Sequence, residues 1–421
     1  MSSQSIRNVV LVGHNGNGKT TLAEAMLYRA GVLSRMGRVD DGTAHCDHDP
    51  EEKARHQSLG ATVASFDWRD HRVNIIDTPG YTDFVSEAVN GMHAADLAVF
   101  VVDAVSGVQA QDQVMWRHAE RLGLPRMVFV NGLDRERSSF ERTLDGLQSH
   151  FGSHVEAVEL PLGVEASFHG IADLVGDGAL DYSSGQSAAA PIPDDVASAA
   201  SDGHIQLVED VVEGDDELLE QYLEGEEPTQ EQLEQLIRTA VVHRNVFPVL
   251  CGSAAKPIGV DHLLDFICRA GPAPGDTGPV AAVRGGEAVT LEIDDAGPPV
   301  VLVFKTRIDD FLGQISFMKV LSGTIRSNET LVNSRTGDKE RLHNLMSFTG
   351  ADHHAVDHFD AGDIVAVTKL GDVRTGDTLS NDAALSVPIT PPPVPVYGVA
   401  VHATAPAQED KLASALRRFA T

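Results

Sequence analysis

The sequence predicts an α/β fold for its first 275 residues and an antiparallel β-barrel after them, and three observations support this prediction. Apolar runs alternate with amphipathic helical stretches over the first 150 residues, as in a mainly parallel sheet covered on both faces. The motif G-x-x-x-x-G-K-[ST] occupies Gly13–Thr20, between one such run and a helical pattern. Short alternating strands with glycine-containing turns fill residues 298 to 386. The apolar runs of the first part are Val9–Val12, Val73–Ile76, Leu97–Val102 and Met127–Val130.

Composition limits the class of protein. A chain of 421 residues predicts two or three domains, and its three scattered cysteines indicate a reducing compartment rather than a disulfide framework. No apolar run approaches the roughly 18 residues of a membrane span, and no secretion signal is recognisable, so we expect a cytoplasmic protein that does not bind membranes. The net charge of −30 disfavours broad nucleic-acid binding but permits local contacts with a ribonucleoprotein.

The glycine-rich motif follows the apolar run Val9–Val12 and predicts a phosphate-binding loop. Its glycines allow the backbone to curl so that N–H groups point at phosphate oxygens. Lys19 adds a positive charge, and Thr20 offers a hydroxyl for Mg²⁺. We therefore expect the loop to bind a nucleotide through Gly13, His14, Asn15, Gly16, Asn17, Gly18, Lys19, Thr20 and Thr21.

A second apolar strand, Val73–Ile76, is followed by Asp77-Thr78-Pro79-Gly80. Ligands of such sheets bind at the carboxyl ends of the strands, where these residues stand. Asp77 can reach Mg²⁺ through water, and the Gly80 N–H can contact a terminal phosphate. A D-x-P-G turn alone would be uninformative, but behind a phosphate loop it indicates a nucleotide site.

Two later strands end in residues that suit a guanine base. Met127–Val130 precedes Asn131, which can tie loops together, and Asp134, which can accept hydrogen bonds from the guanine N1–H and 2-amino groups. Adenine does not offer donors in that arrangement. Phe247–Leu250 precedes a small turn at Ser253 and Ala254, whose backbone N–H groups can approach the guanine carbonyl oxygen.

With these residues in view, the chain resembles translational GTPases, specifically elongation factor G and its paralogues. The resemblance spans nearly the whole chain and includes Asp77–Phe84, Gly107–Gln111, Trp116-Arg117 and Phe129–Asn131. It implies GTP or GDP and Mg²⁺ as cofactors and GTP hydrolysis as the activity. It also implies the ribosome as partner, through its large subunit and stalk protein, and we expect a monomer.

The resemblance divides the chain into parts with expected boundaries. A P-loop GTPase domain spans 1–275 and contains an inserted α+β subdomain at 155–245; a β-barrel domain spans 290–388, and 389–421 begin an incomplete third α+β domain. Because the chain stops there, it looks truncated. We expect a surface loop at Ser183–Ala200, helices within 205–242, a strand at Val394–His402 and a helix at Gln408–Phe419. The last segment should pack on the barrel or remain mobile.

Three departures from the family pattern bear on activity. Ser58 stands where the family has a threonine ligand of Mg²⁺, and serine lacks the methyl group that stiffens the rotamer. Tyr81 replaces the histidine that orients the attacking water, and a neutral phenol cannot act as an imidazolium. Gly132 replaces the lysine of N-K-x-D and removes a cover over the guanine ring. We predict slow hydrolysis, with Lys19, Gly80 and Tyr81 at the reacting phosphate and Thr20, Ser58 and Asp77 at the metal.

Two other functions remain open on the sequence. The chain could be a nucleotide-dependent module that binds ribosomes or a protein partner without turnover. It could also be an ATPase that uses the same phosphate loop, because Gly132 weakens one guanine signature.

Overall fold

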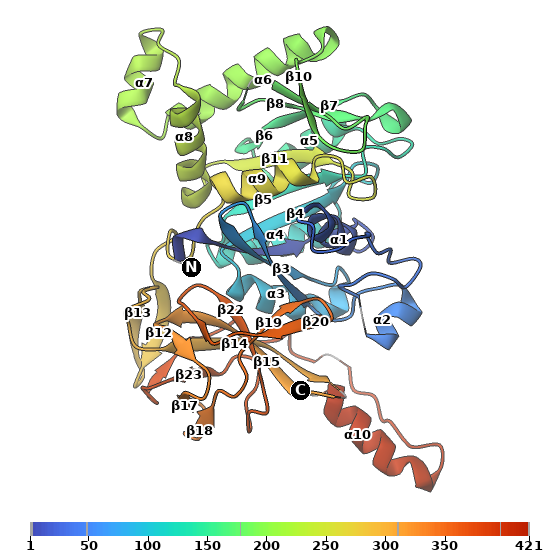
Figure 1. Cartoon of the computed structure of the whole chain (residues 1–421), viewed down its shortest axis with the longest axis vertical. Helices are drawn as coiled ribbons and strands as arrows, with labels where there is room; N and C mark the ends of the chain where they lie inside the picture. Colours follow the sequence, from blue (N-terminus) through green and yellow to red (C-terminus); the bar gives the residue numbers. More distant parts are fainter. Residues whose placement is uncertain (1–2, 48, 177, 310, 396, 420–421) are drawn as a thin grey trace.

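A computed structural model of the chain describes residues 3–47, 49–176, 178–309, 311–395 and 397–419. The inserted elements lie at one end, the central sheet in the middle and a β-rich domain at the other end (Figure 1). The predicted fold class is confirmed as a mixed sheet with a phosphate loop, an inserted antiparallel subdomain and a β-rich region after them. In the described part of the chain, every helix is too short or too polar to cross a membrane.

The central sheet has the strand order β2-β3-β1-β4-β5-β11-β6, and its strands are parallel except for β2, which pairs antiparallel with β3. The apolar runs predicted five of these strands, whereas β2 mixes apolar and polar residues and, like the short β6, was missed. The strands are β1 Ile6–Val12, β2 Thr62–Trp68, β3 His71–Asp77, β4 Leu97–Asp103, β5 Arg126–Asn131, β6 Val155–Ala157 and β11 Phe247–Gly252.

Helices cover both faces of the central sheet. Alternate residues of β1 point to opposite sides: Val9 and Leu11 pack with α1 and α9, while Val10 and Val12 pack with α3, α4 and α5. Each face therefore has its own apolar core. The helices are α1 Lys19–Arg29, α2 Pro50–Arg55, α3 Val85–Ala94, α4 Ala110–Arg121, α5 Phe140–Phe151 and α9 Val260–Ala270.

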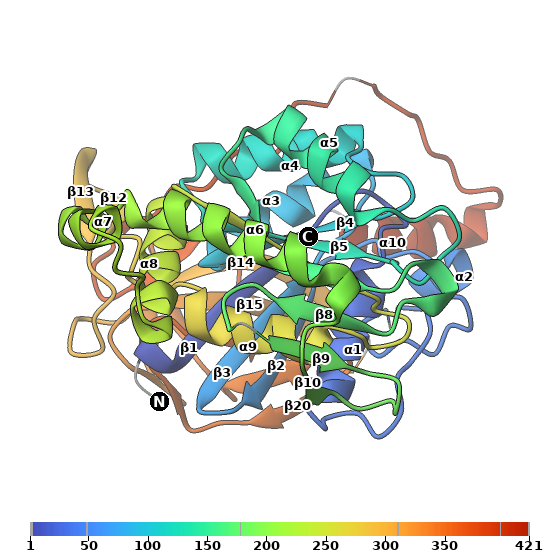
Figure 2. The ribbon, with the colours of Figure 1, turned by 90° about the horizontal axis from the view of Figure 1, so that it is seen from above.

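In the described residues, the inserted elements form a four-stranded antiparallel sheet and include the α-helices α6, α7 and α8. Figure 2 looks onto them, with α6 in front of the central sheet. The prediction of a surface loop at Ser183–Ala200 is wrong, because β10 pairs with β9 there and α6 begins at Asp194, with two acidic residues in its first turn. The elements are β7 Glu159–Leu162, β8 Gly170–Asp173, β9 Gly178–Asp181, β10 Ala188–Ala190, α6 Asp194–Val212, α7 Asp216–Leu223 and α8 Gln230–His243.

A buried ion triad joins the inserted sheet to α9. The His262 ring contacts the carboxylate of Glu159 through Nδ1 and that of Asp173 through Nε2, the latter at 3.2 Å. The other Glu159 oxygen accepts the backbone N–H of Cys251 at 2.8 Å, near the end of β11. Glu159 is completely buried and His262 nearly so. The two carboxylates overcome the burial penalty and raise the pKa of His262 to about 10.

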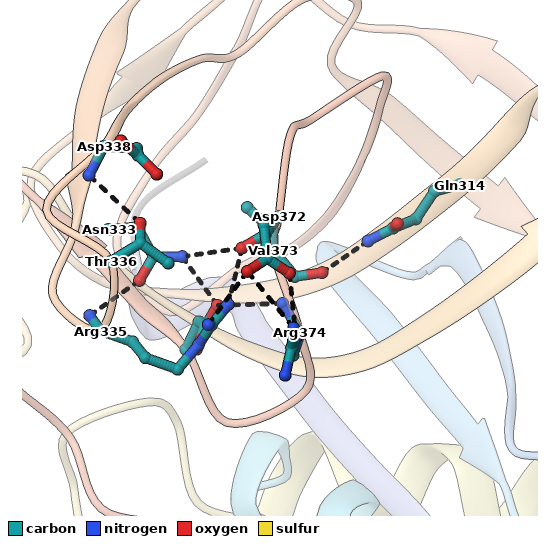
Figure 3. A network of polar contacts seen from close by, with 9 residues as sticks. Gln314, Asn333, Arg335, Thr336, Asp338, Asp372, Val373 and Arg374 are labelled. Atoms are coloured by element: carbon teal, nitrogen blue, oxygen red, sulfur yellow. Dashed lines mark hydrogen bonds and ion pairs between the residues drawn. The ribbon is translucent and has the colours of Figure 1, made fainter. Parts of the chain in front are cut away.

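The β-rich domain is built from antiparallel pairs around an apolar core that includes Val301, Met318 and Val365. At one end Arg335 ties two turns together. Its Nη1 donates to Asp372 at 3.2 Å (Figure 3). Its Nε donates to Asp377 at 2.7 Å. The strands are β12 Val280–Arg284, β13 Glu287–Leu291, β14 Val300–Asp309, β15 Gly313–Ser322, β16 Ile325–Arg326, β17 Thr330–Asn333, β18 Lys339–Arg341, β19 Met346–Thr349, β20 Asp352–Ala355, β21 His358–Phe359, β22 Ile364–Thr368, β23 Thr378–Ser380 and β24 Leu385–Ser386.

The β-rich domain is fastened to the central sheet by backbone and side-chain contacts. In β19, Thr349 pairs with Ala64 of β2, so the two sheets are continuous. Lys319 of β15 donates to the buried carboxylate of Asp96 at 2.5 Å. Since this ion pair is buried, it restrains how the domains sit against each other.

The strand predicted at Val394–His402 is wrong for the described residues, which have no regular structure there. The alternation of apolar residues is strand-like, but no neighbouring strand pairs with it, and Val394, Tyr397 and Val399 are exposed. The helix α10, Glu409–Phe419, follows as predicted and projects away from the β-rich domain (Figure 1).

Candidate nucleotide-binding site

The phosphate loop connects β1 to α1 and curls around the side chain of Lys19. The buried Lys19 ammonium donates to the carbonyl oxygens of Gly13 at 3.0 Å and His14 at 2.9 Å. Burial lowers the pKa of Lys19 to about 8, although nearby carboxylates, Asp77 foremost, oppose this shift. The loop ends where α1 begins, so free helix N–H groups and an ammonium meet at one point, an arrangement that suits phosphate.

Contacts from other strands hold the loop in this shape. The Asn17 side chain donates to the carbonyl oxygen of Val101 at 2.9 Å. The His14 N–H donates to Asp112 at 2.7 Å, and Asp112 is fully buried in the first turn of α4. Of the nine residues predicted to bind phosphates, Gly13, His14 and Asn17 are therefore placed where they support the loop.

The remaining six loop residues line a cavity of about 280 Å³. The structure brings Ser58 and Gly80 to the same cavity, from the segment before β2 and the turn after β3. Three parts of the chain that are far apart in sequence therefore meet at one place. The loop residues are Asn15, Gly16, Gly18, Lys19, Thr20 and Thr21.

Gly80 packs directly against the phosphate loop. A β-carbon at this position would lie 2.5 Å from the backbone nitrogen of Asn15 and 2.5 Å from Nζ of Lys19, so a larger residue would clash. The next residue, Tyr81, is 41% exposed and is not among the described residues that line the cavity. Of the three residues predicted to be catalytic, Lys19 and Gly80 thus line the cavity and Tyr81 lies outside its lining.

The side chains predicted to hold Mg²⁺ lie close together. The hydroxyl oxygens of Thr20 and Ser58 are 3.0 Å apart, and a side-chain hydrogen bond links Thr20 to Asp77. Asp47, which the sequence analysis missed, accepts a 2.7 Å hydrogen bond from Ser58. Among the described residues, buried Oδ1 of Asp77 and Oδ2 of Asp47 have no hydrogen-bond partner. Hydroxyls and carboxylates with free buried lone pairs are the ligands that Mg²⁺ prefers, so this cluster fits that ion.

The two carboxylates of this cluster are buried and repel each other. Burial, and next the charge of Asp47, raise the pKa of Asp77 to about 7. Burial also raises the pKa of Asp47, while the hydrogen bond from Ser58 opposes this shift. A divalent cation would lower both pKa values because it stabilises the ionised carboxylates.

Of the residues predicted to contact the base, Asn131 touches the phosphate loop. Asn131 donates to the carbonyl oxygen of Asn17 and accepts the N–H of Ala254, both at 2.8 Å, so it ties the ends of β5 and β11 to the phosphate loop. Asp134 has one oxygen 3.5 Å from Nζ of Lys256. Within the described chain its other, buried oxygen has no hydrogen-bond partner. That oxygen can accept a hydrogen bond from a base.

The turn after β11 is shaped by its own hydrogen bonds. The N–H of Ser253 donates to the carbonyl oxygen of Ile258 at 3.0 Å, and its hydroxyl accepts the N–H of Lys256 at 3.2 Å. Ala254 donates its N–H to Asn131. Both N–H groups that were expected to approach the base therefore have protein partners, and the turn holds the side chain of Asn131.

At Gly132 the backbone has φ +81°, the left-handed region that favours glycine. The side chain of Arg135 packs here, with its Cδ 3.1 Å from where a β-carbon of residue 132 would lie. Arg135 also forms an ion pair with Asp103 at the end of β4. The Arg135 side chain thus places a positive charge beside residue 132, the position that is lysine in the N-K-x-D motif.

Buried carboxylates hold the segment that carries Asp47 and Ser58, residues 30–61, named here the α1–β2 segment. Glu24 of α1 is fully buried and accepts the N–H groups of His45 at 2.6 Å and Cys46 at 2.9 Å. Glu52 accepts the N–H of Leu59 at 3.0 Å and that of the next residue at 3.2 Å. These contacts fix the backbone next to Asp47 and just after Ser58.

Comparisons with known proteins agree with this geometry. Residues 4–273 match the family described as elongation factor Tu GTP binding domain, and residues 298–382 match elongation factor G domain 2. A crystal structure of a protein from Thermus thermophilus is similar over 99% of this chain, with 35% sequence identity and a TM-score of 0.87. This chain spans 60% of that longer chain. The chain therefore belongs to the translational GTPases that carry the elongation factor Tu GTP-binding domain, and it is of the elongation factor G type.

Proposed function

We propose that this protein binds GTP and GDP together with Mg²⁺ and hydrolyses GTP slowly. The observation that supports this most directly is the meeting of the phosphate loop, Asp47, Ser58 and Gly80 at one cavity. In this proposal the loop N–H groups and Lys19 bind the phosphates, and Gly80 offers its N–H to the terminal one. We further propose the three-part organisation of 1–275, with its insertion at 155–245, then 290–388 and 389–421. Within it, β6 at the start of the insertion pairs with the central sheet, and β12, which precedes residue 290, pairs with β24 of the β-rich domain.

Thr20, Ser58 and Asp77 would hold Mg²⁺, with Asp47 as a fourth contributor. The ion, when bound, neutralises charge on the terminal phosphates. Ser58 already contacts both Thr20 and Asp47, so closing of the α1–β2 segment over the phosphates needs little rearrangement. Lys19 loses much of its burial cost when a phosphate pairs with its ammonium.

Asp134 would select guanine, with Asn131, Ser253 and Ala254 shaping the pocket. A carboxylate accepts from the two donors on the guanine edge, and adenine presents an acceptor at the ring nitrogen instead. This argument favours GTPase over ATPase activity. Lys256 lies close to Asp134 and keeps its charge compensated before a base binds.

The test is a titration of fluorescent GDP and GTP analogues, with Mg²⁺ and with EDTA, and with ATP as competitor. Tight binding of both guanine nucleotides, displaced by unlabelled GTP but not by ATP, is expected. If neither nucleotide binds at millimolar concentration in the presence of Mg²⁺, the proposal is wrong.

Replacing Tyr81 by histidine should speed phosphate release from GTP by about 100-fold, since a positioned general acid–base group contributes roughly 10²–10⁴-fold. Tyr81 is exposed beside Gly80, so a new imidazole can be accommodated without a packing cost. The measurement is single-turnover GTP hydrolysis with and without ribosomes. Tyr81→Phe serves as the control and should hydrolyse GTP no faster than the natural chain. Brisk hydrolysis by the natural chain, unchanged in Tyr81→His, would refute the role assigned to Tyr81.

The alternative is a module that binds a ribosome or a protein in a nucleotide-dependent way without turnover. The exposed position of Tyr81 favours this alternative over fast catalysis. Family membership supports the ribosome, with its stalk protein, as the partner, acting in the cytoplasm. Two measurements separate the two functions: co-sedimentation with ribosomes in GDP, GTP and a non-hydrolysable GTP analogue, and phosphate release from GTP in the same samples. Ribosome binding without phosphate release supports the binding module.

A further inference from the structure

Three backbone N–H groups directly after Ser58 point at carboxylates. Those of Leu59 and Gly60 donate to Glu52, and that of Ala61 donates to Oε2 of Glu87 at 2.7 Å. Glu52 belongs to the α1–β2 segment itself, whereas Glu87 lies on α3, the helix that follows Gly80 and Tyr81. Glu87 therefore links the segment that carries Ser58 to α3, the helix that follows the turn of Gly80 and Tyr81.

The charge of Glu87 is balanced by a lysine from the other domain. Lys305 of β14 is buried, and its ammonium forms an ion pair with the same Oε2 that accepts the Ala61 N–H. The ammonium also lies against Gly60, 3.0 Å from where a β-carbon would stand. A carboxylate in this setting that loses its cation takes up a proton or draws in water, so its hydrogen bond to Ala61 depends on Lys305.

We propose that Lys305 is a positioning residue of the nucleotide site: it holds Glu87, Glu87 holds Ala61, and Ser58 is thereby placed for Mg²⁺. This inference rests on the proposed function of the cavity. Its consequence is that the β-rich domain contributes to Mg²⁺-dependent nucleotide binding without touching the nucleotide. A change in how the two domains pack would reach the metal ligands through this lysine.

The chain offers a matched control. Lys319 is also a buried lysine of the β-rich domain that pairs with a carboxylate of the GTP-binding part, Asp96. Asp96 lies directly before β4 and hydrogen-bonds the side chain of Asn8 at 2.7 Å, away from the α1–β2 segment. Lys319→Met should therefore destabilise the fold as Lys305→Met does, but its nucleotide affinity should depend on Mg²⁺ as strongly as that of the natural chain.

The experiment measures the affinity of the full chain for a fluorescent GTP analogue, with Mg²⁺ and with EDTA. Lys305→Met should weaken binding about tenfold in Mg²⁺, the lower end of the roughly 10- to 100-fold losses on changing groups that orient metal ligands. Binding in EDTA should stay within about twofold, because the described contacts of the Lys305 ammonium, with Glu87 and Gly60, include neither the phosphate loop nor Asp134. Lys305→Arg should restore the Mg²⁺ effect, because it restores the charge.

Equal losses with and without Mg²⁺ in Lys305→Met, or the same Mg²⁺-specific loss in Lys319→Met, would overturn the inference. So would a natural chain whose binding does not depend on Mg²⁺. If circular dichroism shows that Lys305→Met does not fold, Glu87→Gln takes its place. Its affinity for the nucleotide should fall about threefold in Mg²⁺ only, because a neutral amide oxygen accepts the Ala61 N–H more weakly than a carboxylate does. Absence of all nucleotide binding in the natural chain would instead disprove the proposed function, and the inference with it.

Discussion

Asp134→Asn should weaken binding of GTP and GDP by at least about 100-fold, because a site built for hydrogen bonds rejects a ligand that leaves its polar groups unpaired. The buried Oδ1 of Asp134 has no partner among the described residues, so its lone pairs are available for the donors of guanine. An asparagine amide donates where the carboxylate accepted. Xanthine carries a carbonyl oxygen in place of the 2-amino group, so xanthosine triphosphate should gain affinity.

Competition between GTP, xanthosine triphosphate and ATP for a fluorescent nucleotide measures this exchange. Asp103→Asn is the control, because Asp103 is likewise an aspartate buried at the end of a neighbouring strand, β4, and its carboxylate is already paired with Arg135. It should leave the preference for guanine unchanged. An Asp134→Asn chain that still prefers GTP would show that another residue selects the base.

His262→Gln should lower the free energy of unfolding by about 3–5 kcal/mol, the range for breaking a buried ion pair. The substitution leaves Glu159, which is completely buried, and Asp173 without their shared cation. Urea unfolding followed by circular dichroism gives the loss as a shift of the midpoint. His204→Gln is the control: His204 forms a 2.6 Å hydrogen bond with the carbonyl oxygen of Leu174, and losing one hydrogen bond to a backbone carbonyl should cost about 1 kcal/mol.

The same triad predicts how stability changes with pH. The folded chain raises the pKa of His262 from 6.5 to about 10, so the folded state binds this proton more tightly than the unfolded state. The stabilisation is complete below pH 6.5 and is lost as pH rises toward 10. Urea midpoints of the natural chain should fall between about pH 7 and about pH 9.5, and this fall should be reduced in His262→Gln. Parallel pH profiles for both chains would contradict the assignment.

The sequence predicted those site residues whose position follows from a neighbouring strand. Asp77, Asn131 and Asp134 each stand at or just after the end of an apolar run. The structure places the first two against the phosphate loop, where Asp77 is hydrogen-bonded to Thr20 and Asn131 to Asn17. Parallel strands end at the same edge of a sheet, so local pattern is enough to bring such residues together. The strand missed at Thr62–Trp68 and the strand wrongly expected at Val394–His402 show the limit, because strand formation depends on a pairing partner.

What the sequence by itself determined is the phosphate loop and most of the strands and helices around it, because each is encoded within one short stretch. It also places Asp134, the residue proposed to select guanine, just after a strand. Only the tertiary structure decided the partners of these residues. No motif marks Asp47 as a neighbour of Ser58, and Lys305 lies 218 residues from Glu87. Such contacts arise when separate elements pack and buried charges require counter-charges, wherever along the chain those are found.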